Sequence, residues 1–246
     1  MNVIKRIFGA AWAAWMVIFF IISMLIFLIP FLLFCYFHSD RIRNARFIVF
    51  SRVWMNIYLP LIGCPLKKIG RENFRKGQNY IVTSNHNSFL DVMSITPAIP
   101  GPNRTIAKIE MARIPIFGMM YKAGSVLVDR KSDQSRKESY NKMKEALEMG
   151  LHMCIYPEGT RNKTNEPLKS FHSGAFRLAV DTGKPIIPAL MFNTKKALPA
   201  DKGFYALPHR LSIHFLPEVK VNEGETTAAL QQRIYEIMYN YYVENK

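Results

Sequence analysis

The chain opens with a long run of apolar residues. No residue from Ile7 to Phe37 is charged, and these 31 residues would measure about 46 Å as one straight helix at ~1.5 Å per residue. The hydrocarbon core of a bilayer is only about 30 Å thick. The run is also longer than the apolar part of a cleaved signal peptide, and no small-residue cleavage pattern follows it. The sequence therefore predicts a retained, membrane-embedded helical segment.

Basic residues flank this run on both sides. Lys5 and Arg6 precede it, and it is followed by four arginines, Arg41, Arg43, Arg46 and Arg52. A single span would place the more basic C-terminal flank, and the rest of the chain with it, in the cytoplasm. Alternatively the helix breaks at Pro30, residues 47–62 lie back along the surface, and both basic flanks face the same headgroups. We favour the second, monotopic arrangement.

After Pro65, short β-branched runs alternate with helical patterns, which is typical of an α/β domain. Strands are predicted over residues 80–84, 105–108, 125–128, 151–156, 186–191 and 211–216. We expect a mixed, largely parallel sheet flanked by helices. The chain then divides into a membrane-anchoring helical region, residues 1–62, and an α/β domain, residues 63–246.

Two helices of this domain have clear apolar stripes. The first stripe consists of Tyr140, Met143 and Leu147, and the second of Leu230, Ile234, Ile237, Met238 and Tyr241. Ser135 with Glu138 three residues later is typical of a capping box at the start of the first helix, and Gly150 can end it. Residues 193–209 have no clear period and are predicted to form a surface loop.

Charge and cysteine content narrow the class of protein. Lysine and arginine total 33 against 18 acidic residues, so the formal charge of +15 favours anionic partners such as lipid headgroups, nucleic acid or an acidic carrier protein. Cys35, Cys64 and Cys154 are widely separated and form neither a disulfide framework nor a metal-ligand spacing. We therefore expect free, packed thiols in a reducing compartment and no metal site.

His86 and Asp91 are the candidate catalytic pair. His86 follows a predicted strand, where the functional groups of open α/β sheets collect. If a helix begins near Ser88, Asp91 falls on its first turn and can orient the imidazole, leaving the second ring nitrogen free to take a proton from an alcohol. The pattern also fits a plain capping box, in which Asp91 satisfies a helix-start amide. The two roles are compatible.

Asn85, His86 and Asp91 together resemble the first block of the glycerolipid acyltransferase family, typified by the 1-acylglycerol-3-phosphate acyltransferases. Later blocks resemble that family in the same order: Lys108 followed by Pro115-Ile-Phe-Gly118, a strand ending in Asp129-Arg130, Tyr156-Pro-Glu-Gly-Thr-Arg161, and Pro185-Ile-Ile-Pro188. With the segments that end at Gly118 and Arg130 counted as one block, four blocks in order between residues 62 and 191 make the resemblance specific, although each block is short.

The resemblance implies transfer of an acyl group from acyl-CoA or acyl carrier protein to the sn-2 hydroxyl of lysophosphatidic acid, giving phosphatidic acid. His86 would be the general base, with Asp91 as its partner. Arg161 is the first candidate for the acceptor's phosphate, because a guanidinium fork binds two phosphate oxygens at once. The other candidate substrate-binding residues are Arg130, Lys108, Glu158, Gly159 and Thr160. Lys108 is explained equally well as a lysine that snorkels beside the bilayer.

The sequence departs from the family at Phe171-His172-Ser173-Gly174, where members usually carry Phe-Lys-x-Gly. Lys169 is the candidate substitute for the missing lysine, and the acceptor headgroup stays open. There is no Gly-x-Ser-x-Gly elbow, which agrees with a hydroxyl supplied by the substrate and with no acyl-enzyme. We expect no resident cofactor and no metal, only the thioester as co-substrate.

Two other functions are compatible with the sequence. The acceptor could be another lyso-lipid, such as a lyso-ornithine lipid, or the chain could be a non-catalytic binder of anionic membrane. Nucleic-acid binding is suggested by charge alone, without a recognised motif, and is not expected. The expected partners are a lysophospholipid, anionic membrane and a thioester donor, which is either acyl-CoA or acyl carrier protein. The expected location is the membrane, with the catalytic domain at the cytoplasmic face.

Overall fold

The structure is a computed structural model that describes residues 3–246. At its centre lies a seven-stranded sheet with the order β1-β7-β6-β2-β5-β3-β4. Every neighbouring pair of strands is parallel except β6 and β7, which are antiparallel. The predicted mixed, largely parallel α/β sheet is therefore confirmed. The strands are β1 (Leu66–Ile69), β2 (Ile81–Ser84), β3 (Asn103–Lys108), β4 (Ser125–Val128), β5 (His152–Ile155), β6 (Ile186–Phe192) and β7 (Leu211–Phe215).

The central strands are buried on both faces because helices cover both faces of the sheet. All residues of β2, β5 and β6 are buried, as is typical of parallel sheets. The edge strand β1 was not predicted, and its sequence Leu-Lys-Lys-Ile explains why. It pairs only with β7, and lysines are common on exposed edges because they discourage pairing with other chains.

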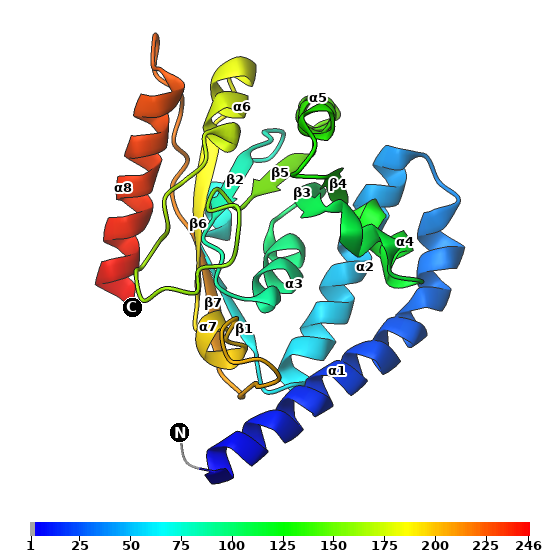
Figure 1. Cartoon of the computed structure of the whole chain (residues 1–246). Helices are drawn as coiled ribbons and strands as arrows, with labels where there is room; N and C mark the ends of the chain where they lie inside the picture. Colours follow the sequence, from blue (N-terminus) through cyan, green and yellow to red (C-terminus); the bar gives the residue numbers. More distant parts are fainter. Residues whose placement is uncertain (1–2) are drawn as a thin grey trace.

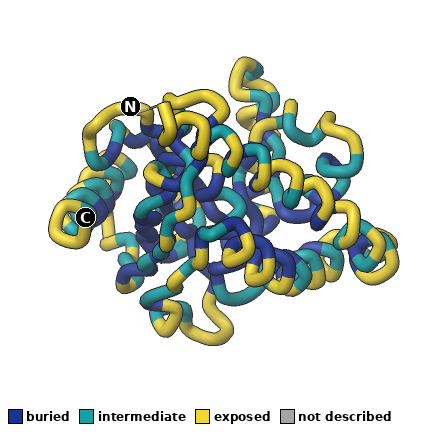
Figure 2. The backbone as a smooth tube through the Cα atoms, turned by 90° about the horizontal axis from the view of Figure 1, so that it is seen from below, coloured by how far each residue is buried: buried dark blue, intermediate teal, exposed yellow. Residues whose placement is uncertain are grey.

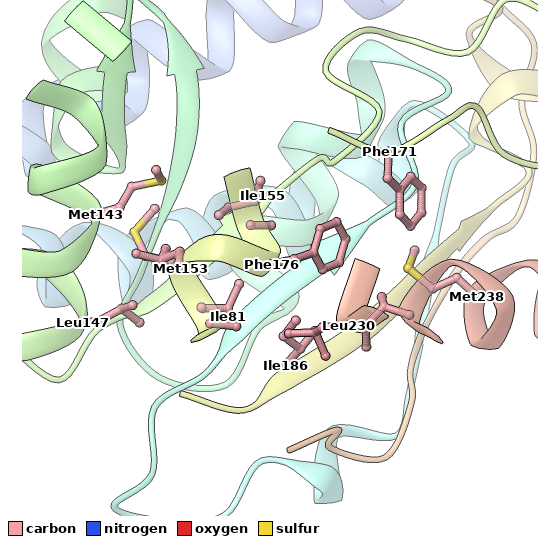
Figure 3. Close-up of a cluster of buried hydrophobic side chains, with 14 of the residues drawn as sticks. Ile81, Met143, Leu147, Met153, Ile155, Phe171, Phe176, Ile186, Leu230 and Met238 are labelled. Carbon is pink, nitrogen blue, oxygen red and sulfur yellow. The ribbon is translucent and has the colours of Figure 1, made fainter. Parts of the chain in front are cut away.

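Helices form layers on either side of the sheet (Figure 1). One layer consists of α5 (Asp133–Glu148), α6 (Gly174–Thr182) and α8 (Thr227–Asn245), and the other side is covered by α3 (Phe89–Ala98). Figure 3 shows the core under the first layer, where Met153 and Ile186 of the sheet meet Leu147, Phe176 and Leu230 of the helices. Figure 2 shows the buried residues gathered in the middle of the molecule.

The start of α5 differs from the prediction. Its N-cap is Ser132, whose Oγ accepts from the backbone N–H of Ser135 at 3.1 Å. Ser135 is therefore inside the helix, and its hydroxyl instead accepts from the backbone N–H of Asp129 at 2.9 Å. Two serines three residues apart both fit the capping pattern, and the contact with Asp129 decides between them. Gly150 follows the helix in the left-handed region, as predicted.

The N-terminal region forms a helical hairpin. Helix α1 (Val3–Phe31) continues as a wide π-helical turn, η1 (Leu32–Tyr36), before the chain reverses into α2 (Asp40–Leu61). The predicted break at Pro30 is wrong, because Pro30 lies inside α1. Pro30 costs the helix one backbone hydrogen bond, and the helix continues through it for another six residues, to Tyr36.

The two helices of the hairpin are joined by aromatic side chains. Trp12 Nε1 donates to the Ile62 carbonyl at 3.1 Å, and the Tyr58 hydroxyl donates to the Met16 carbonyl at 3.0 Å. The outer side of the hairpin remains apolar and exposed, including Ile18, Ile22 and Phe34. By length and composition, Val3–Tyr36 is the one helical stretch among residues 3–246 that could cross a membrane, which is weak evidence for membrane association.

Polar side chains fasten the hairpin to the α/β domain. Buried Asn44 donates to the carbonyls of Asn103 and Ala123, each at 2.9 Å. Arg52 donates to carbonyls just beyond the end of α3, including that of Ile99 at 2.7 Å. Hydrogen bonds from charged donors are stronger than neutral ones, so the position of α2 on the domain is specifically determined.

The segment 193–209 is not the surface loop that was predicted. It contains the short helix α7 (Thr194–Ala197), and both Ala197 and Ala206 are buried. The N–H of Ala206 donates to the Gly9 carbonyl at 3.0 Å, and a Cβ added to Gly9 would lie 2.0 Å from the Tyr205 ring. The apolar residues of this segment pack against α1, so they follow the shape of the hairpin and have no helix or strand period.

Candidate active site

His86 lies in the turn between β2 and α3. Its Nδ1 is 3.0 Å from Oδ2 of Asp91, whose side chain is fully buried. The same carboxylate oxygen accepts from the backbone N–H groups of Asn87 at 2.6 Å and Ser88 at 2.7 Å. Ser88 is the N-cap of α3, so Asp91 completes the capping box and orients His86 at the same time. With Nδ1 as the donor to Asp91, Nε2 is the free acceptor.

The main chain of His86 is held on both sides by the segment that follows β5. Its N–H donates to Glu158 Oε1 at 2.8 Å, and its carbonyl accepts from the N–H of Asn162 at 2.6 Å. The imidazole ring stacks on Tyr156, with the ring centres 4.3 Å apart. The His86 side chain is 16% exposed, so the ring is fixed in place but still reachable from the surface.

A cleft of about 630 Å³ opens at His86. Its lining includes six of the residues predicted from the sequence: His86, Lys108, Arg130, Gly159, Thr160 and Arg161. Lys163 and Lys169 add two further cations, and among residues 3–246 no acidic residue lines the cleft. Five positive side chains therefore face one opening, which favours a ligand with negative charge.

Glu158 was predicted to bind substrate, but its side chain lies behind the cleft wall. It is 2% exposed, and its second oxygen accepts from the backbone N–H of Lys169 at 3.1 Å. Burial raises the pKa of the Glu158 carboxyl to about 7, against the lowering effect of these backbone hydrogen bonds. Its contacts join the His86 turn to the segment around Lys169.

The turn after Glu158 supplies backbone and hydroxyl groups to the cleft. Gly159 has a positive φ of 69°, which is favourable for glycine, and its carbonyl accepts a hydrogen bond from Arg130. Lys169 Nζ donates to Thr160 Oγ1 at 2.6 Å and lines the cleft. Exposed His172 lies against Gly159 and outside the lining. Lys169, and not His172, is therefore the one of these two side chains that lines the cleft.

An apolar cavity of about 130 Å³ adjoins the cleft. Phe89, Val92 and Tyr121 line both spaces. The cavity lies between the hairpin, α3 and α4 (Phe117–Ala123), and the hairpin contributes Phe20 and Trp54 to its wall. Sequence reasoning did not find this cavity, because its apolar residues have the same pattern as ordinary core.

The structure supports the expectation of packed thiols. Cys35, Cys64 and Cys154 are free and buried, and burial raises the pKa of the Cys154 thiol to about 12. Within residues 3–246, no cluster of three or more His, Cys, Asp or Glu side chains could hold a metal ion.

Known proteins resemble this chain in sequence and in fold. The family model described as Acyltransferase matches residues 65–192. The 1-acyl-sn-glycerol-3-phosphate acyltransferase alpha of Mus musculus is 31% identical over 76% of this chain and 65% of its own length. The 1-acyl-sn-glycerol-3-phosphate acyltransferase of Helicobacter pylori is 32% identical over 67% of each chain. The 1-acyl-sn-glycerol-3-phosphate acyltransferase of Saccharomyces cerevisiae is 29% identical over 63% of this chain and 52% of its own length.

The fold has a counterpart among solved structures. The crystal structure of the 1-acyl-sn-glycerophosphate acyltransferase PlsC from Thermotoga maritima matches with a TM-score of 0.80, over 98% of this chain and 97% of that chain, at 19% identity. The match covers the hairpin as well as the sheet. The chain spans about half to two thirds of the length of the curated relatives described above. The family model covers more than half of the chain, and the chain therefore belongs to the acyltransferase family.

Proposed function

We propose that this protein transfers a fatty acyl group from a thioester to the sn-2 hydroxyl of lysophosphatidic acid, giving phosphatidic acid. The observation that carries the proposal is the buried Asp91 carboxylate 3.0 Å from His86, at the edge of a cationic cleft that adjoins an apolar cavity. A phosphate-bearing acceptor matches the cationic cleft, and the acyl chain of the donor matches the apolar cavity. The names of the relatives support the same acceptor.

The reaction is a direct transfer between two bound substrates. Nε2 of His86 removes the proton of the acceptor hydroxyl as that oxygen attacks the thioester carbonyl. The new C–O bond forms, the C–S bond breaks, and the thiolate leaves with the proton carried by His86. Ser88 is not placed as a nucleophile, because its hydroxyl donates to the Leu198 carbonyl at 2.7 Å. The sequence of steps therefore needs no acyl-enzyme and no resident cofactor.

The function is tested by offering labelled acyl-CoA and acyl carrier protein thioesters with lysophosphatidic acid and other lyso-lipids. Acylation of lysophosphatidic acid above the other acceptors is expected. Preferred acylation of a lyso-ornithine lipid would identify that lipid as the acceptor in place of lysophosphatidic acid. If no acceptor were acylated, the protein would instead be a non-catalytic binder of anionic membrane.

Arg161 is proposed to hold the acceptor's phosphate. Replacing Arg161 with alanine should raise the apparent KM for lysophosphatidic acid about tenfold or more, because hydrogen bonds to charged groups contribute about 1.5–3 kcal/mol. Initial rates at varied acceptor and fixed donor give this value. Arg177→Ala is the matched control, since Arg177 is an exposed arginine outside the cleft. An unchanged acceptor KM with weakened donor binding would assign Arg161 to the donor.

The number of cations in the cleft also bears on the donor. A phosphomonoester carries about −1.5 to −2 charges near pH 7, whereas five cations line the cleft and its lining has no carboxylate. One acceptor phosphate leaves positive charge without a partner. A thioester that itself carries phosphate fits this excess, and coenzyme A and acyl carrier protein both do. The assay with the two donors separates them.

The apolar cavity is proposed to take part of the donor's acyl chain. Ser51 is a small residue in its wall. Ser51→Phe should fill much of the cavity and lower kcat/KM for a palmitoyl donor about tenfold relative to an octanoyl donor, because each methylene group excluded from an apolar site loses about 0.8 kcal/mol of burial. Ser51→Ala, which removes the hydroxyl without filling space, should leave the ratio unchanged. An equal loss for both chain lengths would place the acyl chain elsewhere.

The hairpin is proposed to lie in one leaflet of the membrane. Its exposed apolar side chains would enter the lipid, and Arg41 and Arg43 at the start of α2 would face anionic headgroups. Because basic flanks favour the cytoplasmic side of a membrane, we place the catalytic cleft at the cytoplasmic surface. The lipid acceptor could reach His86 without leaving the bilayer completely.

A further inference from the structure

Asn162 connects the turn that carries Arg161 to the main chain of His86. Its backbone N–H donates to the His86 carbonyl at 2.6 Å. The residue is 1% exposed, and its own side chain folds the following turn. Oδ1 accepts from the N–H of Thr164 at 2.9 Å and from its hydroxyl at 2.7 Å, while Nδ2 donates to the Glu166 carbonyl at 2.9 Å.

The cleft is lined by the neighbours of Asn162 and not by Asn162 itself. Arg161 and Lys163 both line it, whereas the side chain of Asn162 points into the protein. The turn is also held from its far side, where Lys195 of α7 donates to the Thr164 carbonyl. Both hydrogen-bonding atoms of the Asn162 amide have partners, so the residue has a fixed position between the proposed base and the proposed phosphate ligand.

We propose that Asn162 is a positioning residue that sets the distance between Arg161, which binds the acceptor's phosphate, and His86, which faces the acceptor's reacting hydroxyl. This inference rests on the proposed function. The phosphate, at Arg161, and the hydroxyl, at His86, belong to one molecule. Binding energy from the phosphate speeds the reaction only if the two groups are held at the correct separation. Loosening the connection reduces the catalytic benefit that the enzyme obtains from the phosphate.

The test compares two acceptors that differ only in the phosphate, lysophosphatidic acid and the monoacylglycerol with the same acyl chain. In Asn162→Ala, which removes the three side-chain hydrogen bonds of Asn162, the ratio of their kcat/KM values should fall about tenfold from that of the wild type, because one such bond contributes about 0.5–1.5 kcal/mol. Asn162→Asp retains the Oδ1 acceptor for Thr164 and should recover part of the ratio. If Asn162→Ala does not fold, Asn162→Asp still tests the inference.

A structural control is available at the other end of the sheet. Asn79 is buried before β2 and donates to the carbonyls of Leu147 at 2.6 Å and Leu151 at 3.2 Å. Asn79→Ala should lower the thermal midpoint but leave the acceptor ratio unchanged. An unchanged ratio in folded Asn162→Ala and Asn162→Asp would overturn the inference. A wild-type protein that transfers to neither acceptor, or that does not prefer the phosphate-bearing one, would contradict the proposed function instead.

Discussion

Replacement of His86 with alanine is expected to lower kcat by about 10²–10⁴-fold, the range that a positioned general base contributes. The acceptor hydroxyl is a poor nucleophile while it keeps its proton, and His86 presents the one imidazole in the lining of the cleft within residues 3–246. The KM for the acceptor should change little, because Arg161 and its neighbours remain. The measurement is acyl transfer in detergent micelles and in vesicles at saturating donor.

His172→Ala is the matched control for this variant. His172 is an exposed histidine beside Gly159 that does not line the cleft, so its loss should leave kcat near the wild-type value. Circular dichroism of both variants checks that the fold is retained. If His86→Ala kept wild-type kcat, the general-base assignment would be wrong, and the cleft would have to activate the hydroxyl by another group.

The sheet could be predicted from the sequence because most of its strands are buried on both faces. Runs such as Ile186–Phe192 can be recognised without knowledge of their neighbours. The edge strand β1 and the segment 193–209 could not be predicted. The structure of β1 depends on its pairing with β7, and that of the segment depends on contacts with α1, both far away in the sequence. The hairpin was anticipated, but its turn lies beyond Pro30 because the apolar run continues as helix through the proline.

In the candidate site, too, contacts between residues close in sequence could be predicted, whereas contacts between distant residues could not. Spacing alone predicted that Asp91 lies near His86. His86 lies in the turn before α3, and Asp91 lies in the first turn of that helix. Glu158 could be identified as important from its motif, but its burial and its hydrogen bond to the His86 N–H require the pairing of β2 with β5. Asn162 carried no signal in the sequence. Its contact with the His86 carbonyl joins residues that lie far apart in the sequence.

Replacement of Asp91 with asparagine is expected to lower kcat by about 10²–10⁴-fold with a small effect on either KM. In serine proteases the equivalent change at the histidine's carboxylate partner lowers kcat about 10⁴-fold, because the imidazole adopts the wrong tautomer. Asp91 Oδ2 accepts from three groups here, His86 Nδ1 and the N–H groups of Asn87 and Ser88. Asparagine keeps one acceptor oxygen but loses the charge that stabilises the imidazolium during transfer.

Because Asp91 also caps α3, the variant will lose some stability, and the two effects have to be separated. Ser88→Ala does this: Ser88 Oγ caps the same helix by accepting from the Leu90 N–H at 3.3 Å, without contact to His86. Loss of an N-cap costs about 1 kcal/mol, so Ser88→Ala should unfold at a lower temperature while its kcat stays within about threefold of the wild type. If the two variants lost activity in proportion to their loss of stability, Asp91 would be a capping residue only, and His86 would act without a carboxylate partner.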